Sequence, residues 1–199
     1  INLDNLTHNL NVIRTQVGPK AKLLGVVKAD AYGHGAVRVA RHLEKIGAEY
    51  LAISNIDECE ELRVNGIKLP ILMLGFTPAD QAERILALDM TQAVVNLDIA
   101  RAYSAAAVKS GKTMRIHIKL DTGMHRLGFI PEEVDVLIER LSALRSIRVA
   151  SVFAHLSCAD DSAQDDFTRE QIALFDKMSS RIAKALPYEV LRHTANSAA

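Results

Sequence analysis

The chain has 199 residues, and 49% of them are hydrophobic, which is enough apolar side chain for one well-packed domain. Its 24 Lys and Arg residues balance 24 Asp and Glu residues without any block of like charge, so the composition argues against a nucleic-acid groove or a surface for anionic membranes. No apolar run approaches the roughly 20 residues that span a bilayer, no signal peptide opens the sequence, and two cysteines are too few for a secreted disulfide framework. The sequence therefore predicts a cytoplasmic domain with a small-molecule partner.

Short apolar runs of β-forming residues alternate with segments of helical period. The predicted strands are 23–28, 50–54, 70–75, 91–95, 114–120, 148–156 and 188–194. The predicted helices are 4–16, 36–47, 55–66, 78–88, 96–111, 132–144 and 165–186. Asn55, Asp98 and Asp165 are candidate helix caps. Several strands are continuous Val, Ile and Leu runs, which is typical of parallel strands covered on both faces.

Repeating β/α units at this spacing are compatible with a (β/α)8 barrel or with an open doubly wound sheet. No Gly-x-Gly-x-x-Gly follows the first strand, which leaves a dinucleotide site without support, and we favour the barrel. Seven predicted strands are one fewer than a closed barrel needs. The sequence therefore predicts an α/β fold of the (β/α)8 TIM-type barrel class, truncated after its seventh strand, with residues 1–199 as one incomplete domain.

The sharpest local pattern is GVVKADAYGHG at 25–35. Lys28 closes a buried strand and so lies at the carboxyl end of the sheet, where barrels place their active sites. A partly desolvated amine of this kind suits Schiff-base chemistry, and Gly33 and Gly35 let the backbone turn tightly beside a bulky ligand. An isolated strand-end lysine more often extends into solvent. The surrounding motif favours the interpretation of Lys28 as a nucleophile.

Three segments together carry a resemblance to a known family. VVKADAYGHG resembles the pyridoxal-phosphate attachment motif of alanine racemases, in which some members have Asn at the position of Asp30. IHIKLDTGMHRLGF (116–129) resembles the second motif of that family, and RHTANSAA (192–199) is similar to its phosphate-binding segment. Because the segments keep the family's order and near-family spacing, the chain is identified as a member of the alanine racemase family, the fold-type III pyridoxal-phosphate enzymes.

The resemblance implies a pyridoxal 5'-phosphate enzyme that interconverts L-alanine and D-alanine and supplies D-alanine for peptidoglycan. Lys28 would be the Schiff-base lysine and one of two catalytic bases. Arg126 would contact the phenolic oxygen of the cofactor and orient the substrate carboxylate, for which a planar guanidinium is well suited. The position of Lys119 carries a carbamate in many relatives, with an unmodified lysine as the alternative. Leu74 would line the pocket or belong to ordinary barrel packing.

The same resemblance assigns the remaining cofactor contacts. Tyr32 and Ser197 would bind the phosphate, with Asn196 beside Ser197, because loops after the seventh barrel strand commonly bind phosphate. A helix cap is the alternative for this Asn-Ser pair, and the two roles are compatible. His155 would stack near the pyridine ring, and His193 would support an arginine of the eighth strand. A histidine satisfied within the core is the alternative for both.

Two further expectations concern substrate and assembly. His125 stands where many relatives have glycine, and some members of the family, including serine racemases, show the same departure from glycine. Alanine and serine therefore both remain candidate substrates. Family members act as homodimers, and the second base is a tyrosine from the partner's C-terminal β domain. That domain is absent from this sequence, so residues 1–199 alone are predicted to be inactive. A cofactor-carrier barrel of the pyridoxal-phosphate homeostasis type is the non-enzymatic alternative, although the segment 122–128 fits the racemases better.

Overall fold

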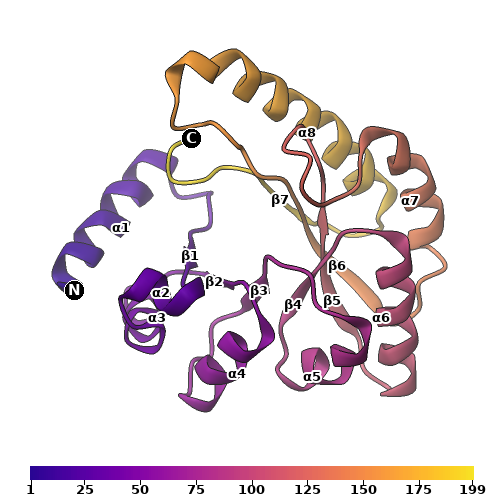
Figure 1. The fold of residues 1–199 in the computed structure, drawn as a ribbon, viewed down its shortest axis with the longest axis horizontal. Coiled ribbons are helices and arrows are strands. Elements are labelled where there is room, and N and C mark those ends of the chain that lie inside the picture. Colours follow the sequence, from indigo (N-terminus) through magenta and orange to yellow (C-terminus); the bar gives the residue numbers. More distant parts are fainter. The chain divides into compact units, whose positions relative to one another are not determined.

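The computed structural model describes residues 1–199, which form two compact units. The first unit comprises residues 1–77 and 84–92, and the second comprises residues 78–83 and 93–199. Both units alternate strands with helices along the chain (Figure 1). Within each unit, neighbouring strands are consecutive in the sequence and parallel, as expected when helical crossovers connect them.

The first unit is built on a parallel sheet with a buried centre. Its strands are β1 (Leu24–Val26), β2 (Tyr50–Ile53), β3 (Ile71–Met73) and the start of β4 (Thr91–Val94). Its helices are α1 (Leu3–Val17), α2 (Lys28–Gly33), α3 (Ala36–Lys45), α4 (Ile56–Val64) and most of α5 (Ala82–Ala87), which follows a 3-10 turn at Ala79–Gln81. The residues 51–53 and 71–73 are all buried, so β2 and β3 form the centre of the core.

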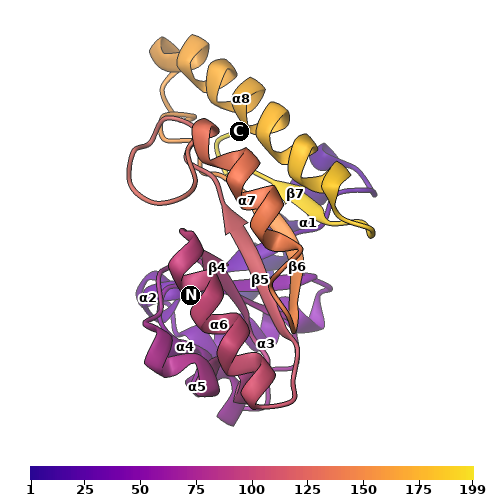
Figure 2. The same cartoon turned by 90° about the vertical axis from the view of Figure 1, so that its right-hand side faces the viewer.

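The second unit contains three strands and three α-helices. The strands are β5 (Met114–Lys119), β6 (Ile147–Phe153) and β7 (Leu191–His193). The helices are α6 (Leu97–Lys109), α7 (Val134–Leu141) and α8 (Asp165–Ala185), with 3-10 turns at Pro131–Glu133 and Ser162–Gln164. In this unit α6 and α8 pack against β6, and α7 lies beside α8 (Figure 2).

The fold class predicted from the sequence is confirmed: the chain is an α/β protein of the (β/α)8-barrel type that ends with its seventh parallel strand. Every predicted strand and helix is present. Several strands end earlier than predicted, with β1 stopping at Val26 and β6 at Phe153. At these carboxyl ends the chain leaves the sheet and enters the loops that carry the candidate functional residues.

Of the three residues predicted to cap helix starts, one does so in the structure. Asn55 caps α4, and its partner in the capping box is Glu58. The prediction for Asp98 was wrong, because Asn96 caps α6 and leaves Asp98 in the first turn, where its charge is favourable at the positive end of the helix dipole. Asp165 is likewise the first residue of α8 and not its cap.

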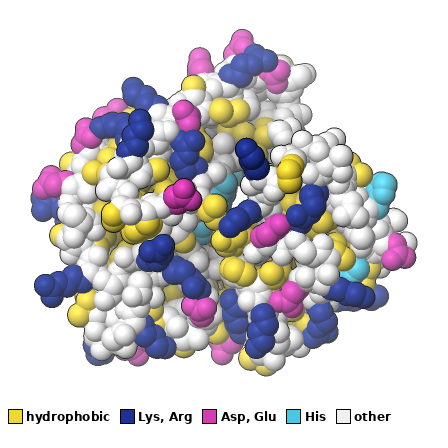
Figure 3. Space-filling view, turned by 180° about the vertical axis from the view of Figure 1, so that it is seen from behind, with side chains coloured by type: hydrophobic (Ala, Val, Ile, Leu, Met, Phe, Trp, Pro, Cys, Tyr) yellow, Lys and Arg dark blue, Asp and Glu magenta, His cyan; other side chains and the backbone are white.

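The surface carries both signs of charge. On the face drawn in Figure 3, Lys and Arg side chains are interspersed with Asp and Glu side chains, in keeping with the net charge of zero. None of the helices combines the length and the apolarity that a bilayer crossing requires.

Candidate active site

Lys28 begins α2, two residues after the carboxyl end of β1. The segment is not a right-handed helix, because Ala29 to Tyr32 have φ of 52° to 57° and ψ of 37° to 51°. A left-handed backbone costs an L-residue about 1 to 2 kcal/mol, because Cβ approaches the following carbonyl oxygen. Four such residues in succession beside a candidate nucleophile form a strained segment that its neighbours must hold in place.

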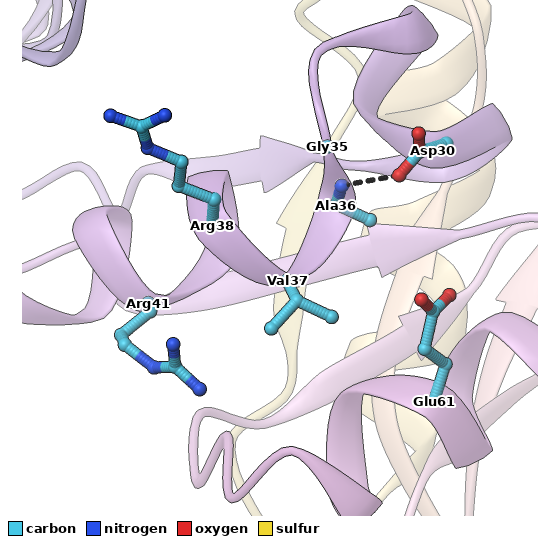
Figure 4. Close-up of a pocket in the computed structure, with 7 residues that line it drawn as sticks. All are labelled: Asp30, Gly35, Ala36, Val37, Arg38, Arg41 and Glu61. Carbon is cyan, nitrogen blue, oxygen red and sulfur yellow. Dashed lines mark hydrogen bonds between the residues drawn. The ribbon is translucent and has the colours of Figure 1, made fainter.

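Hydrogen bonds at both ends close this left-handed turn. The Ala31 N–H donates to the Val27 carbonyl oxygen, and the Gly35 N–H donates to the Asp30 carbonyl oxygen, both at 2.9 Å. The Asp30 Oδ1 accepts from the Ala36 N–H at 2.6 Å, at the rim of an open pocket (Figure 4). The Asp30 carboxylate therefore connects the turn to the amino end of α3.

The sequence predicted a tight turn at the glycines of this motif, and the structure extends the unusual backbone upstream. Gly33 and Gly35 do have positive φ, of 82° and 91°. The left-handed residues Ala29 to Tyr32 were missed, because alanine and tyrosine carry no preference for this conformation. Only the contacts around them could reveal it.

Lys28 and Tyr32 lie together on this turn. The Lys28 Nζ is 5.9 Å from the centroid of the Tyr32 ring, within the range of a cation–π contact. The Tyr32 side chain is 62% exposed, which leaves its hydroxyl accessible to a ligand. Leu74 follows β3, where its N–H donates to the Ile53 carbonyl oxygen at 2.9 Å and its side chain is half-buried. The first unit thus carries an amine, a hydroxyl and an apolar side chain after β1 and β3.

In the second unit, Lys119 ends β5 and is almost fully buried, with 7% of its surface exposed. Its Nζ lies 4.7 Å from the centroid of the Phe153 ring. Burial and the positive charge of Arg126 together lower the pKa of Lys119 to about 8, while the charge of Asp121 acts in the opposite direction. Lys119 is therefore a lysine with a substantial neutral fraction near physiological pH.

The loop after β5 folds back along the end of its own strand and carries Arg126. The Phe129 N–H donates to the Lys119 carbonyl oxygen, and the Asp121 N–H donates to the Phe129 carbonyl oxygen, both at 2.9 Å. A Cβ on Gly128 would lie 2.7 Å from the Lys119 carbonyl oxygen, so this close approach requires glycine. The guanidinium of Arg126 is exposed and forms no ion pair within the chain, which leaves it available for an anion.

Asp121 organises the turn that contains His125. Its Oδ1 accepts from the N–H groups of Gly123 at 2.9 Å and of His125 at 3.0 Å. Burial alone would raise the pKa of Asp121, but these hydrogen bonds outweigh burial and lower it. His125 has φ of 55°, a left-handed conformation that glycine adopts more readily than histidine.

A cluster of polar side chains from β5, β6 and β7 lies near Lys119, and His117 and Ser151 of this cluster are buried while His193 is half-buried. A register shift between Ile116 and His117 places His117 opposite Ser151 of β6. The His117 Nδ1 and the Ser151 Oγ are hydrogen-bonded, and the Ser151 Oγ is 3.2 Å from the His193 Nε2. Burial lowers the pKa of His193 to about 4, with a further contribution from Lys119. Both histidines are therefore neutral at physiological pH, since burial, together with His193, also holds the pKa of His117 well below its ordinary value.

Sequence reasoning selected His193 but missed His117 and Ser151. A signal for His117 did exist, because it lies two residues before Lys119 on one strand and so shares its face. Ser151 could not be found in this way, since its contact with His117 depends on the shifted register between β5 and β6.

The remaining predicted residues lie in the loops after β6 and β7. His155 follows β6, and its carbonyl oxygen accepts from the Gln171 Nε2 at 3.4 Å. The Asn196 Nδ2 donates to the Leu156 carbonyl oxygen at 3.0 Å, and its Oδ1 accepts from the Ala198 N–H at 3.0 Å. Ser197 is exposed beside it. Asn196 therefore joins the two loops and caps the turn that begins at Ser197.

Comparison with known proteins gives a consistent result over the whole chain. The sequence profile described as "Alanine racemase, N-terminal domain" matches residues 1–199. "Alanine racemase 2" of Caldanaerobacter subterraneus subsp. tengcongensis is 39% identical over 200 residues, covering 100% of this chain and 51% of that protein. "Amino-acid racemase" of Enterococcus faecalis is 41% identical over 181 residues, covering 89% of this chain and 25% of that protein.

Solved structures agree. The alanine racemase of Clostridium difficile 630 superposes with a TM-score of 0.94 at 41% sequence identity, covering 100% of this chain and 55% of that one. The chain spans about half the length of the curated alanine racemases that it matches.

Proposed function

The chain belongs to the family of alanine racemase N-terminal domains, and on this basis we propose that the protein interconverts L-alanine and D-alanine with pyridoxal 5'-phosphate as cofactor. Its product would be D-alanine for peptidoglycan. The observation that carries the proposal is the placement of Lys28, which a strained turn holds after the carboxyl end of β1 with Tyr32 beside it. An amine held in this way is suited to attach a cofactor that carries a carbonyl group.

The donor groups of the candidate residues suit this cofactor, which has an aldehyde, a phosphate and a phenolic oxygen. Lys28 offers an amine for the aldehyde. Tyr32 and Ser197 offer exposed hydroxyl groups for the phosphate. Arg126 offers a guanidinium without an ion pair for the phenolic oxygen and for the carboxylate of the substrate. We assign these four residues as direct contacts of cofactor or substrate.

Four further residues would shape the site around these contacts. His155 would lie near the pyridine ring, and Leu74 would line the pocket. Asn196 would fix the loop that carries Ser197, in keeping with its two hydrogen bonds. His193, which is neutral because burial lowers its pKa to about 4, would support an arginine from the eighth strand of the family's barrel.

When bound, pyridoxal phosphate supplies the electron-withdrawing group that makes the α-proton of an amino acid removable. The Lys28 Nζ would take or return this proton on the D-side of the α-carbon. Racemisation also needs a proton carrier on the opposite face, which in the family is a tyrosine of the partner subunit. We therefore propose a cytoplasmic homodimer as the working form.

Lys119 would act through Arg126. Its lowered pKa favours the neutral amine that reacts with carbon dioxide, and the resulting carbamate would be an anion beside the guanidinium. We propose that this carbamate holds Arg126 in position for the carboxylate of the substrate.

A serine racemase of the same family is the second candidate. The relative from Enterococcus faecalis is named an amino-acid racemase, and His125 occupies a position that is glycine in many relatives. Assays of the complete protein with L-alanine and L-serine separate the two. A higher kcat/KM for serine would favour the second candidate.

The attachment site is tested with Lys28→Ala in the complete protein, with Lys20→Ala as a control at an exposed lysine. After incubation with the cofactor and borohydride reduction, peptide mapping should find the pyridoxyl group on Lys28 in the wild type and in the control. The Lys28→Ala variant should lose both this label and racemisation. A wild-type label on any lysine other than Lys28 would overturn the assignment, and cofactor attachment without turnover would favour a carrier protein.

A further inference from the structure

The Glu58 carboxylate accepts hydrogen bonds from two separate parts of the first unit. Its Oε2 accepts from the Ser54 N–H at 2.8 Å and from the Asn55 N–H at 3.4 Å, and the Ser54 hydroxyl lies at 3.2 Å. Its Oε1 accepts from the Ala29 N–H at 2.8 Å, across 29 residues of sequence. Ala29 is the residue that follows Lys28 and the first left-handed residue of the turn.

Helix capping explains only part of this arrangement. The Asn55 side chain accepts from the Glu58 N–H at 3.0 Å, and the Glu58 carboxylate returns a bond to the Asn55 N–H, which completes an ordinary capping box. A capping box does not require the second oxygen. The bond from Ala29 therefore connects α4 and the end of β2 to the backbone that carries Lys28.

We propose that Glu58 is a positioning residue for Lys28, an inference that rests on the proposed role of Lys28 as the attachment lysine. The Ala29 N–H belongs to the peptide group that also contains the Lys28 carbonyl, so a bond to this N–H sets the orientation of that peptide plane. The plane in turn sets the direction in which the Lys28 side chain leaves the backbone. A displacement of about 1 Å at a reacting group can lower a rate about 100-fold.

The chemistry of the site requires a carboxylate. Every group that faces the Glu58 side chain here is a donor: three backbone N–H groups and one hydroxyl. An ionised carboxylate only accepts, so both of its oxygens are used. Glutamine would have to turn its NH2 group toward either Ala29 or Ser54, and one of these bonds would be lost.

The test compares three variants of the complete protein. Glu58→Gln removes the double acceptor, and Asn55→Ala removes the reciprocal cap of α4 without altering the acceptor of the Ala29 N–H. Glu61→Gln is the matched control, because Glu61 is an exposed residue of the same helix whose carboxylate forms no hydrogen bond or ion pair. The first measurement is amide hydrogen exchange at Ala29 in the cofactor-free protein, and the second is kcat and KM with the cofactor bound.

We expect Glu58→Gln to exchange the Ala29 amide about tenfold faster or more and to lose about 10- to 100-fold in kcat with a smaller change in KM. Asn55→Ala and Glu61→Gln should keep wild-type exchange at Ala29 and wild-type kcat. Unchanged exchange at Ala29 in folded Glu58→Gln would overturn the proposal. So would a loss of kcat in Asn55→Ala equal to that in Glu58→Gln, because the role would then be helix capping alone.

Two features keep the test decisive. If Glu58→Gln fails to fold, exchange in the wild type decides, because the exposed Ala29 amide should be protected about tenfold relative to an unstructured peptide. An unprotected amide would refute the contact. Amide hydrogen exchange at Ala29 in the cofactor-free protein does not depend on racemisation. Failure of the proposed function would therefore appear in the attachment and turnover assays and would leave the exchange measurement unaffected.

Discussion

Ala29 has a backbone conformation (φ 52°, ψ 51°) that glycine adopts more readily than alanine. We expect Ala29→Gly to change the free energy of unfolding by less than about 0.5 kcal/mol or to raise it, since the relief of left-handed strain offsets the greater entropy of an unfolded glycine. Ala105→Gly is the control, because Ala105 is also exposed but lies within α6, where glycine costs about 1 kcal/mol. Urea unfolding of both variants makes the comparison, and equal losses would show that the turn is not left-handed in solution.

Lys119 should form a carbamate that depends on pH. With a pKa of about 8, about a quarter of Lys119 is neutral at pH 7.5, against about 0.1% of an ordinary lysine. The neutral fraction rises as the pH increases through 8 and falls on acidification, so the carbamate should form at pH 8 and be lost in acid. Carbon-13 NMR of protein in labelled bicarbonate should show a carbamate signal that is absent in Lys119→Arg and retained in Lys112→Arg. A wild-type spectrum without the signal at pH 8 would refute carbamylation.

At the scale of elements, the loop from Asp121 to Phe129 depends on its contact with the end of β5. Gly128→Ala should lower the free energy of unfolding by about 3 kcal/mol or more, because its Cβ would lie within 3 Å of backbone atoms of Lys119, Leu120 and Asp121. Gly47→Ala is the control: Gly47 also has positive φ but open space around it, so it should lose only about 1 to 2 kcal/mol.

Thermal or urea unfolding measures both glycine variants. Because the loop carries Arg126, Gly128→Ala should also lower kcat/KM, whereas Gly47→Ala should not. Equal stability losses in the two variants would mean that the loop can move away from β5 without cost.

Strands and helices could be predicted from the sequence because each depends on a local pattern of apolar residues. The same pattern placed Lys28 at the carboxyl end of the first strand, although the structure ends β1 at Val26 and leaves this strand only partly buried. The left-handed turn could not be predicted, because a bond to Glu58 from a different βα unit helps to hold Ala29 in place. The contact between His117 and Ser151 could not be predicted for a similar reason, since one extra residue in β6 decides which side chains of β5 and β6 lie opposite each other.

At the scale of the whole molecule, the proposed racemisation needs a second proton carrier besides Lys28, and the chain's own tyrosines are the first candidates to consider. The chain has four. Tyr103 is completely buried in α6, and burial raises its pKa. Tyr50 begins β2, at the end opposite to the loops that carry the candidate site, and the Tyr188 hydroxyl accepts from a backbone N–H of β6. Tyr32 remains, on the same turn as Lys28.

We therefore expect residues 1–199, prepared alone with the cofactor, to racemise alanine no faster than free pyridoxal phosphate. In the proposed mechanism a proton is exchanged on each face of the α-carbon, and Lys28 would serve only one of them. Circular dichroism would first establish that the preparation is folded, and chiral chromatography would then follow D-alanine. Turnover within about tenfold of the complete protein, a difference of about 1.4 kcal/mol in the barrier, would show that no second carrier from outside this chain is needed.

The left-handed turn also bears on the order in which the protein folds. A non-glycine residue has positive φ only a few per cent of the time, so four in succession arise by chance on the order of once in 10⁵ conformations or fewer. We therefore expect this segment to form only after β2 and α4 have brought Glu58 within reach. Substitutions at Ala29 that lower the free energy of unfolding should then raise the rate of unfolding and leave the rate of refolding unchanged in stopped-flow experiments, while slower refolding would contradict this order. A newly made chain would complete its core first and orient its attachment lysine last.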